Sequence, residues 1–276
     1  MFYRGLGDAL MLNSVMFELG RQRGRNHLLG TNYYELFKGN PYITLLPFKS
    51  QRIHHQIGKL LKLAGLVSNL HYLDYYRNSQ QPGQHILSVL SNEAGVRQPP
   101  VKPAIYLNQS ELIRAKLPDT GKPWIAIQST GLATWTDNKN WGHQKMGKVI
   151  ELLKSDYSFL QLGSHDDPSL SVDLNLSGKV SPREAICYLK RCQKMVAQEG
   201  FLMHAAAAVG VPSVIIYGGF IAPWQSGYDC NINLYTTLPC APCFLTSPCP
   251  YGKRCLEDIK PSHVIEALHS IHPVTD

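Results

Sequence analysis

Six short apolar runs in the second half of the chain constrain its fold more than any other feature. They are WIAIQST, SFLQLG, VDLNLSG, KMVAQEG, PSVIIYGG and INLYTT, and helix-like stretches separate several of them. One such stretch, SPREAICYLKRC, has Ser181 as the expected N-cap, Pro182 at the first helical position and Glu184 three residues after the cap. This alternation of strands and helices predicts an α/β fold with a parallel sheet covered by helices.

The first half of the chain shows a weaker form of the same alternation. We expect helices over Asp8–Leu19, ending at Gly20, and over Arg52–Leu63, and a strand over residues 68–76. Prolines and polar residues between Gln98 and Pro123 mark a join. The sequence therefore predicts two Rossmann-like domains facing a cleft, over residues 1–110 and 121–276.

The chain is basic, with a formal net charge of +7, and much of the excess lies in RQRGRNH and KSQRIHHQIGKLLKLAG. Such an excess favours anionic partners, namely nucleotides, phosphorylated sugars or an anionic membrane face, although it also fits a merely solvated surface. There is no run of 18 apolar residues and no signal-peptide pattern at the N-terminus. We therefore expect a cytoplasmic protein.

The stretch YRGLGDAL near the N-terminus is the first candidate ligand loop. Gly5 and Gly7 allow a close backbone approach, and the helix that follows offers free N–H groups. Asp8 lies at the start of that helix, where it is either an N-cap or a carboxylate that acts in chemistry.

The second candidate loop is QSTGLATWTDNKNWG, which follows the strand that begins at residue 124. Ser129, Thr130 and Thr134 can donate hydrogen bonds to phosphate oxygens, and Lys139 can neutralise a diphosphate. The alternative is a polar surface loop in which Trp141 packs onto the sheet.

Two further loops follow later strands, where ligands of doubly wound sheets bind. In LGSHDDPSL, Asp166 or Asp167 could contact ribose hydroxyls, or either could cap the next turn. In QEGFLMHAAAAVG, the start of a helix provides a carboxylate, N–H donors and a histidine that is either a ligand or a packing residue. The candidate binding residues there and in the following YGGF are Glu199, Gly200, His204, Gly218 and Gly219.

Four of the seven cysteines lie in the segment CAPCFLTSPCPYGKRC, residues 240–255. Cys240, Cys243, Cys249 and Cys255 have the spacing C-x2-C-x5-C-x5-C. A C-x2-C pair chelates one ion, and two further thiolates complete a tetrahedral set, which favours a structural zinc or iron site. Free thiols and an adventitious disulfide are the competing interpretations.

The order of these elements resembles glycosyltransferase family 9, the ADP-heptose:lipopolysaccharide heptosyltransferases and their relatives, which include autotransporter heptosyltransferases. The matching stretches are YRGLGDALMLNSVMFEL, NPYI, KNW, EGFLMHAAAAVGVPSVIIYGG, CAPC and CLEDIKPSHV. They span nearly the whole chain, and the late block is the most specific.

This resemblance implies a GT-B fold with an N-terminal acceptor domain and a C-terminal nucleotide-sugar domain, and an inverting reaction without a catalytic metal. It assigns Asp8 as the general base and Lys139 as the group that stabilises the departing diphosphate. The family commonly has aspartate where this chain has Glu199, a residue that would contact the sugar.

The function that the resemblance implies is transfer of a sugar, heptose by likeness, from an ADP-sugar to a hydroxyl. The acceptor is a bacterial glycolipid such as the lipopolysaccharide core, or a protein, and peripheral contact with the cytoplasmic face of the inner membrane is an option. The alternative is a non-catalytic, metal-stabilised binding or assembly protein with a GT-B-like fold. No nucleic-acid partner is expected, because the interleaved aromatic and basic residues of such a surface are missing.

Overall fold

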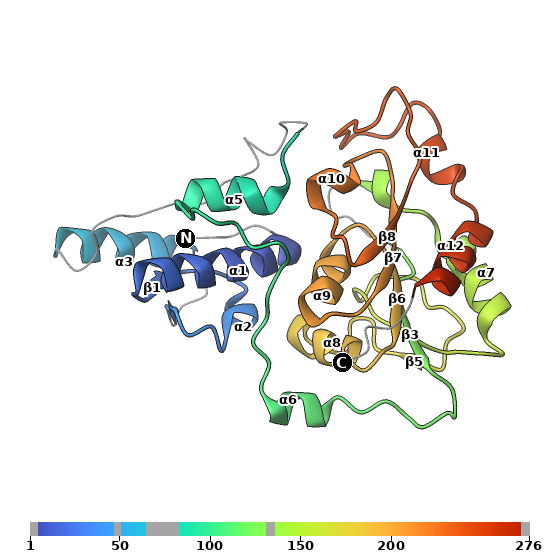
Figure 1. Ribbon diagram of the computed structural model, residues 1–276, viewed down its shortest axis with the longest axis horizontal. Helices are drawn as coiled ribbons and strands as arrows, with labels where there is room; N and C mark the ends of the chain where they lie inside the picture. The colour runs from blue at the N-terminus through green and yellow to red at the C-terminus, as the bar shows by residue number, and fades with distance from the viewer. Residues whose placement is uncertain (1–4, 47–50, 65–82, 131–135, 272–276) are drawn as a thin grey trace. The chain divides into compact units, whose positions relative to one another are not determined.

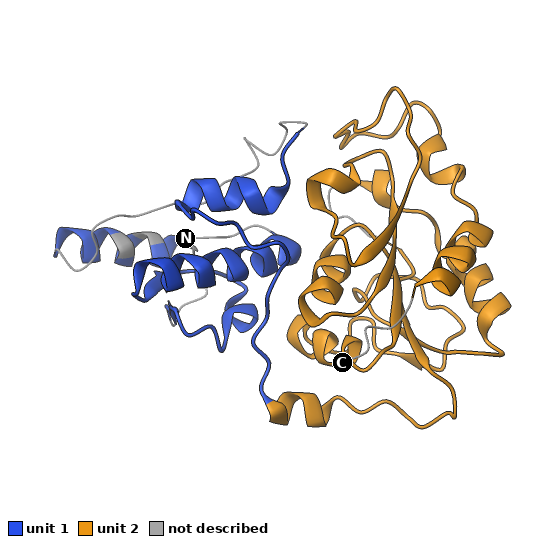
Figure 2. Cartoon of the chain, in the orientation of Figure 1, with its two compact units in different colours: residues 1–108 blue, residues 109–276 orange. Residues whose placement is uncertain are grey.

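The computed structural model describes residues 5–46, 51–64, 83–130 and 136–271, and divides the chain into two compact units (Figure 2). Unit 1 is Met1–Asn108 and unit 2 is Gln109–Asp276. The strand expected over residues 68–76 and the candidate residue Thr134 lie outside the described residues.

Unit 1 is built around the helix α1 (Leu6–Arg23), which packs against α2 (Tyr34–Phe37) and α5 (Ile86–Ala94). Two short parallel strands, β1 (His27–Leu29) and β2 (Ile43–Leu45), pair with His27 opposite Ile43. The remaining helix described here, α3 (Gln51–Leu63), is the expected basic amphipathic segment.

The prediction that α1 ends at Gly20 is wrong. Gly20 is an interior residue of the helix, and it is small because a Cβ there would clash with the ring of Tyr42. The helix instead ends at Gly24, whose φ of 61° is the left-handed conformation in which glycine has no steric penalty.

Asn40, the first residue of the NPYI stretch, forms buried side-chain hydrogen bonds to Asn13 of α1. The Asn40 amide donates to the side-chain oxygen of Asn13 at 2.8 Å and to the Asn13 carbonyl at 3.0 Å. The Asn13 amide in turn donates to the carbonyls of Leu36 and Ala104. Because a buried amide is costly unless it is hydrogen-bonded, these contacts fix α1 against the chain that follows it.

Unit 2 contains a six-stranded sheet in which every paired strand is parallel, as the apolar runs predict. The strands are β3 (Trp124–Ile127), β4 (Ser158–Gln161), β5 (Leu174–Asn175), β6 (Lys194–Gln198), β7 (Ser213–Tyr217) and β8 (Asn231–Tyr235). Their order in the sheet is β5-β4-β3-β6-β7-β8. This is the 3-2-1-4-5-6 order of a dinucleotide-binding fold, so the direction of winding reverses between β3 and β6.

Helices cover both faces of this sheet (Figure 1). On one face, α7 (His143–Leu153) and α12 (Pro261–Ser270) pack onto an apolar core that includes Ile125, Val196 and Ile216. On the other face lie α8 (Pro182–Leu189) and α9 (Phe201–Val209). The central strands are fully buried, which is why they read as continuous apolar runs and not as alternating ones.

The start of α8 confirms the expected capping box. The Ser181 hydroxyl accepts from the Glu184 N–H at 3.2 Å, and the Glu184 carboxylate accepts from the Ser181 N–H at 2.9 Å. These hydrogen bonds lower the pKa of the Glu184 carboxyl. Shorter elements complete unit 2: α6 (Gln109–Arg114), the 3-10 turn η1 (Asp137–Lys139), α10 (Pro223–Ser226) and α11 (Arg254–Glu257). No described helix has the length and apolar character needed to cross a bilayer.

Candidate functional site

The carboxyl ends of β3 and β6 define the candidate site in unit 2. In open α/β sheets, ligands bind at this edge, where the winding reverses. The residues that follow these two strands are Ser129 and Thr130 after β3, and Glu199 and Gly200 after β6. The topology therefore places four of the candidate binding residues at the position where a nucleotide is expected.

Lys139 and Glu199 form an ion pair at this edge. The Lys139 ammonium lies 2.5 Å from a Glu199 carboxylate oxygen, and only 15% and 7% of the two side chains are exposed. The same ammonium lies 4.8 Å from the centre of the Phe220 ring, in a cation–π contact. A cation is thus held in a largely desolvated position, where it interacts more strongly with an anion than it would in water.

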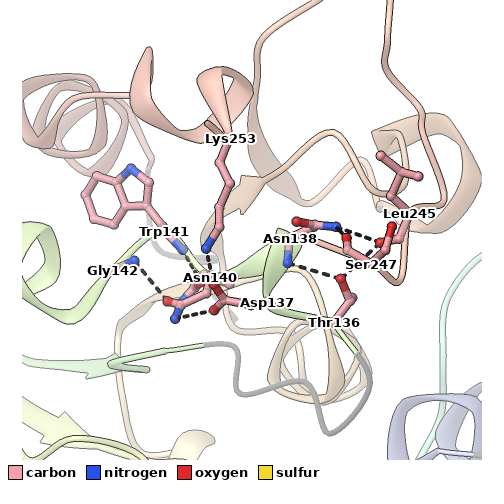
Figure 3. Close-up of polar contacts among 10 residues, drawn as sticks. Thr136, Asp137, Asn138, Asn140, Trp141, Gly142, Leu245, Ser247 and Lys253 are labelled. Atoms are coloured by element: carbon pink, nitrogen blue, oxygen red, sulfur yellow. Dashed lines mark hydrogen bonds and ion pairs between the residues drawn. The ribbon is translucent and has the colours of Figure 1, made fainter. Parts of the chain in front are cut away.

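The turn that carries Lys139 is connected to the cysteine-rich segment (Figure 3). The Asn138 side-chain amide donates to the carbonyls of Leu245 at 2.7 Å and Ser247 at 2.8 Å, and the Thr136 hydroxyl donates to the Leu245 carbonyl at 3.0 Å. Lys253 forms an ion pair with Asp137.

Trp141, next in this loop, is a core residue, as its alternative interpretation predicted. It is 2% exposed, and its indole N–H donates to the Ile259 carbonyl at 2.9 Å. Its backbone N–H donates to the Gln198 side-chain oxygen at 2.6 Å, which ties the loop to the end of β6.

The hydroxyls after β3 are engaged inside the protein. Gln161 donates to the Ser129 hydroxyl at 3.2 Å, and the Thr130 hydroxyl donates to an Asp167 carboxylate oxygen at 3.1 Å. Both residues are buried. They shape the loop in this state, and contact with a phosphate would require these hydrogen bonds to be exchanged.

The two aspartates after β4 have different environments. Asp167 is buried and accepts hydrogen bonds from the Ser164 N–H at 3.0 Å and the Ser164 hydroxyl at 3.2 Å, so it caps its turn. Burial raises the pKa of its carboxyl, while the hydrogen bonds from Ser164 and Thr130 oppose that rise. Asp166 is 85% exposed and lies 3.3 Å from the ring of His165.

The start of α9 lies directly after Glu199. Gly200 has φ 155° and ψ −156°, a combination that glycine alone adopts readily, and it leads the chain from β6 into the helix. His204, in the first turn, is buried and shares a 2.7 Å hydrogen bond with the Tyr228 hydroxyl. A buried ring that is hydrogen-bonded within the protein agrees with the interpretation of His204 as a packing residue.

The glycine pair after β7 has a packing reason. A Cβ on Gly218 would lie 2.6 Å from the Asn138 carbonyl oxygen, and one on Gly219 would lie 3.2 Å from the Cys255 sulfur. The Gly219 N–H donates to that sulfur at 3.0 Å. Both glycines thus allow the turn η1 and the cysteine-rich segment to approach the end of the strand.

Asp8 lies in unit 1 and is not the N-cap of its helix. The helix α1 begins at Leu6 with Gly5 as N-cap, so Asp8 occupies the third helical position. Its carboxylate accepts from the Gly5 N–H at 2.9 Å, which is half of a capping box. The predicted helix start at Asp8 was wrong because the helix also includes Leu6 and Gly7, which the apolar periodicity places outside it.

The four clustered cysteines differ in exposure. Cys240 is exposed, Cys243 and Cys249 are half-buried, and Cys255 is buried. Burial raises the pKa of the Cys255 thiol; the Gly219 and Leu256 N–H groups lower it, and the nearby Cys249 and Cys243 raise it further. Within the described ranges, no three or more side chains of histidine, cysteine, aspartate or glutamate are arranged to hold a metal ion.

Sequence reasoning missed three residues of this site: Asn138, Gln198 and Phe220. Gln198 is a fully buried polar residue at the end of an apolar strand, and that contrast could have marked it. Asn138 and Phe220 act through partners far away in the sequence, so no local pattern identifies them.

The strand order of unit 2 is that of the doubly wound α/β folds. The model of glycosyltransferase family 9 (heptosyltransferase) matches residues 55–253. The chain belongs to this family, and this match confirms the resemblance seen in its motifs. At the level of the family, the chain is a glycosyltransferase.

Known proteins are consistent with this assignment. Lipooligosaccharide heptosyltransferase 2 of Haemophilus influenzae is 30% identical over 94 residues, which cover 29% of this chain and 27% of that protein. The match thus spans about a quarter of that relative.

Two solved structures share the fold. ADP-heptose lps heptosyltransferase II of E. coli superposes with a TM-score of 0.70 at 17% identity, covering 98% of this chain and 97% of that chain. TibC, a bacterial iron-containing dodecameric glycosyltransferase of enterotoxigenic E. coli, gives a TM-score of 0.69 at 15% identity, covering 98% and 75%. TibC has also been solved in complex with ADP-D-beta-D-heptose.

Proposed function

We propose that this protein is an inverting glycosyltransferase that moves heptose from ADP-heptose to an acceptor hydroxyl. The observation that carries the proposal is the largely buried Lys139 ammonium beside Glu199, at the strand ends of a family 9 chain. The relative TibC supports the choice of donor, since it has been solved in complex with ADP-D-beta-D-heptose.

In this proposal, unit 2 binds the donor. The adenosine diphosphate lies beyond β3 and β6, near the N–H groups at the start of α9. Lys139 exchanges its contact with Glu199 for the diphosphate as negative charge develops on the leaving group. Glu199 is then free to contact a sugar hydroxyl.

Asp8 supplies the base. It accepts the proton of the acceptor hydroxyl as that oxygen attacks the anomeric carbon, and the ADP leaves from the opposite face. Gly5 and Gly7 have no side chains of their own to place beside this carboxylate. Unit 1 thus binds the acceptor and unit 2 the donor, as in a GT-B enzyme.

The four cysteines would hold a structural zinc or iron ion. Four thiolates suit either metal, but the described side chains are not gathered into a group that could hold an ion in this structure. TibC, an iron-containing relative, supports the same proposal. Such an ion would order the loop and would take no part in the reaction.

The acceptor is a glycolipid, such as the lipopolysaccharide core, or a protein, and the enzyme acts at the cytoplasmic face of the inner membrane. The helix α3 supports membrane contact. It has no acidic residue, and its leucines Leu60 and Leu63 are 64% and 84% exposed beside Lys59 and Lys62. A helix with these features binds at the surface of anionic membranes.

Thermal shift and calorimetry with ADP and ADP-sugars test the donor assignment. We expect ADP to raise the melting temperature, since a ligand that binds the folded state stabilises it by mass action. The Asp8→Asn variant should bind ADP normally and lose transfer to a working acceptor. If no nucleotide bound, or if Asp8→Asn transferred sugar at the wild-type rate, the chain would better fit a non-catalytic binding protein or the base would be wrong.

A further inference from the structure

The turn η1 carries Lys139, the cation proposed to stabilise the leaving group. A segment that is distant in the sequence holds this turn in place through direct hydrogen bonds. Two of its three residues, Asp137 and Asn138, contact the cysteine-rich segment, more than 100 residues away in the sequence. We propose that Asn138 is a positioning residue that uses this segment to set the place of the Lys139 ammonium. The inference rests on the proposed function of Lys139.

This role uses both side-chain donors of Asn138. Its amide carries two N–H donors, and both are used, on the Leu245 and Ser247 carbonyls (Figure 3). The residue is 5% exposed, and its own N–H donates to the Thr136 hydroxyl at 3.1 Å. Asn138 therefore has no donor left for a diphosphate, and its effect on the reaction passes through its neighbour.

The other side of the turn is also fixed. The Asn138 carbonyl lies against Gly218, at the end of β7, where no side chain would fit. The backbone of the turn therefore packs closely against the end of β7 while its side-chain amide is bonded to the cysteine-rich segment. Lys139 is consequently held at both ends of its turn.

The cysteine-rich segment also fixes the ring that lies under the lysine. The Cys243 N–H donates to the Gly219 carbonyl at 2.7 Å, and the Phe244 N–H donates to the Phe220 carbonyl at 3.1 Å. The Phe220 ring contacts the Lys139 ammonium at 4.8 Å and the Phe244 ring at 6.1 Å between centroids. One segment thus holds both the turn that carries the cation and the aromatic face beside it.

A double-mutant cycle on ADP affinity tests the proposal without requiring the acceptor. Calorimetry would compare wild type, Asn138→Ala, Lys139→Ala and the double variant. We expect Lys139→Ala to weaken ADP binding about tenfold or more, because a charge-assisted contact is lost. Asn138→Ala should weaken it about fivefold, and the double variant should lie within about twofold of Lys139→Ala.

The cycle separates positioning from general stability. If both single variants weaken binding and their effects multiply in the double variant, Asn138 does not act through Lys139 and this inference is overturned. If Lys139→Ala binds ADP as wild type does, the proposed role of Lys139 fails and the inference fails with it.

Arg191→Ala is the matched control. Arg191 also fastens a segment by donating to two backbone carbonyls, those of Ala115 at 3.2 Å and Leu112 at 2.5 Å, but it does so away from η1. The Arg191→Ala substitution should lower the melting temperature and leave the affinity for ADP unchanged. A loss of ADP affinity in Arg191→Ala as large as that in Asn138→Ala would show a general effect and count against the proposal.

Thr136→Val provides a milder variant should Asn138→Ala fail to fold. It removes the donation to the Leu245 carbonyl and the acceptor of the Asn138 backbone N–H, and it keeps the Asn138 side-chain amide. Its smaller effect on ADP binding should also vanish in the Lys139→Ala background. Persistence of the effect there would contradict the proposal.

Discussion

Adding one methyl group at Gly218 should displace the lysine turn. The Cβ of an alanine there would lie 2.6 Å from the Asn138 carbonyl oxygen, and 3.2 Å from a Leu256 side-chain carbon. An ordinary carbon–oxygen contact is about 3.3 Å, so the backbone of η1 must move by roughly 0.7 Å. The obstacle is a backbone atom, which cannot turn away as a flexible side chain can.

The expected cost follows from two opposing terms. Overpacking costs about 1–3 kcal/mol, and replacing glycine by alanine returns up to about 1 kcal/mol through the unfolded chain. The net loss of about 1–2 kcal/mol should lower the melting temperature by about 2–8 °C. A displacement close to 1 Å at a binding cation should also weaken ADP binding by about tenfold.

Gly147→Ala is the matched control for this substitution. Gly147 lies inside α7, and a Cβ there would meet nothing nearer than a Leu170 methyl carbon at 3.9 Å. Since alanine favours a helix by about 1 kcal/mol over glycine, this variant should be more stable than wild type and bind ADP equally well. Differential scanning fluorimetry would measure the melting temperature of both variants, and calorimetry would measure their affinity for ADP. A Gly218→Ala protein with wild-type stability and affinity would refute the packing that we describe.

Three further outcomes follow from the structure. Because burial raises the folded-state pKa of Asp167, its carboxylate stabilises the fold less as pH rises. The stability of wild type relative to Asp167→Asn, measured by urea unfolding, should therefore fall between pH 4 and pH 7, and a rise would contradict the assignment. Ser181→Ala should lose about 1 kcal/mol of unfolding free energy through the capping box of α8, with no change in ADP affinity. Metal removal from residues 240–255 by a chelator should lower the melting temperature and weaken ADP binding, and elemental analysis giving well under half an equivalent of zinc or iron per chain would argue against the site.

The parallel sheet of unit 2 could be predicted because each strand carries its own signal. Strands buried on both faces are largely apolar, and the helix α8 is marked by Ser181, Pro182 and Glu184. The order of the strands then places the residues after β3 and β6 at one edge. Local sequence thus identified the candidate loops of this unit.

The connections inside the site could not be predicted, because they join distant segments through single polar groups. Nothing in DNKNW indicates that Asn138 binds the carbonyls of Leu245 and Ser247. The glycines have the same property: Gly20 and Gly218 look like a helix end and a ligand loop, yet each leaves room for another part of its own unit. A glycine can thus indicate that another segment packs closely, but the sequence does not show which segment it is.

The separation between η1 and its supports has a consequence for synthesis. The Asn138 amide precedes its carbonyl partners by 107 and 109 residues, and Trp141 precedes the Ile259 carbonyl by 118. At a translation rate of about 5–20 residues per second, the lysine turn waits roughly 5–20 seconds before these partners are made. A nascent chain can therefore build most of the sheet while its donor site is still unassembled, and we expect nucleotide binding only after residues 245–259 have been synthesised.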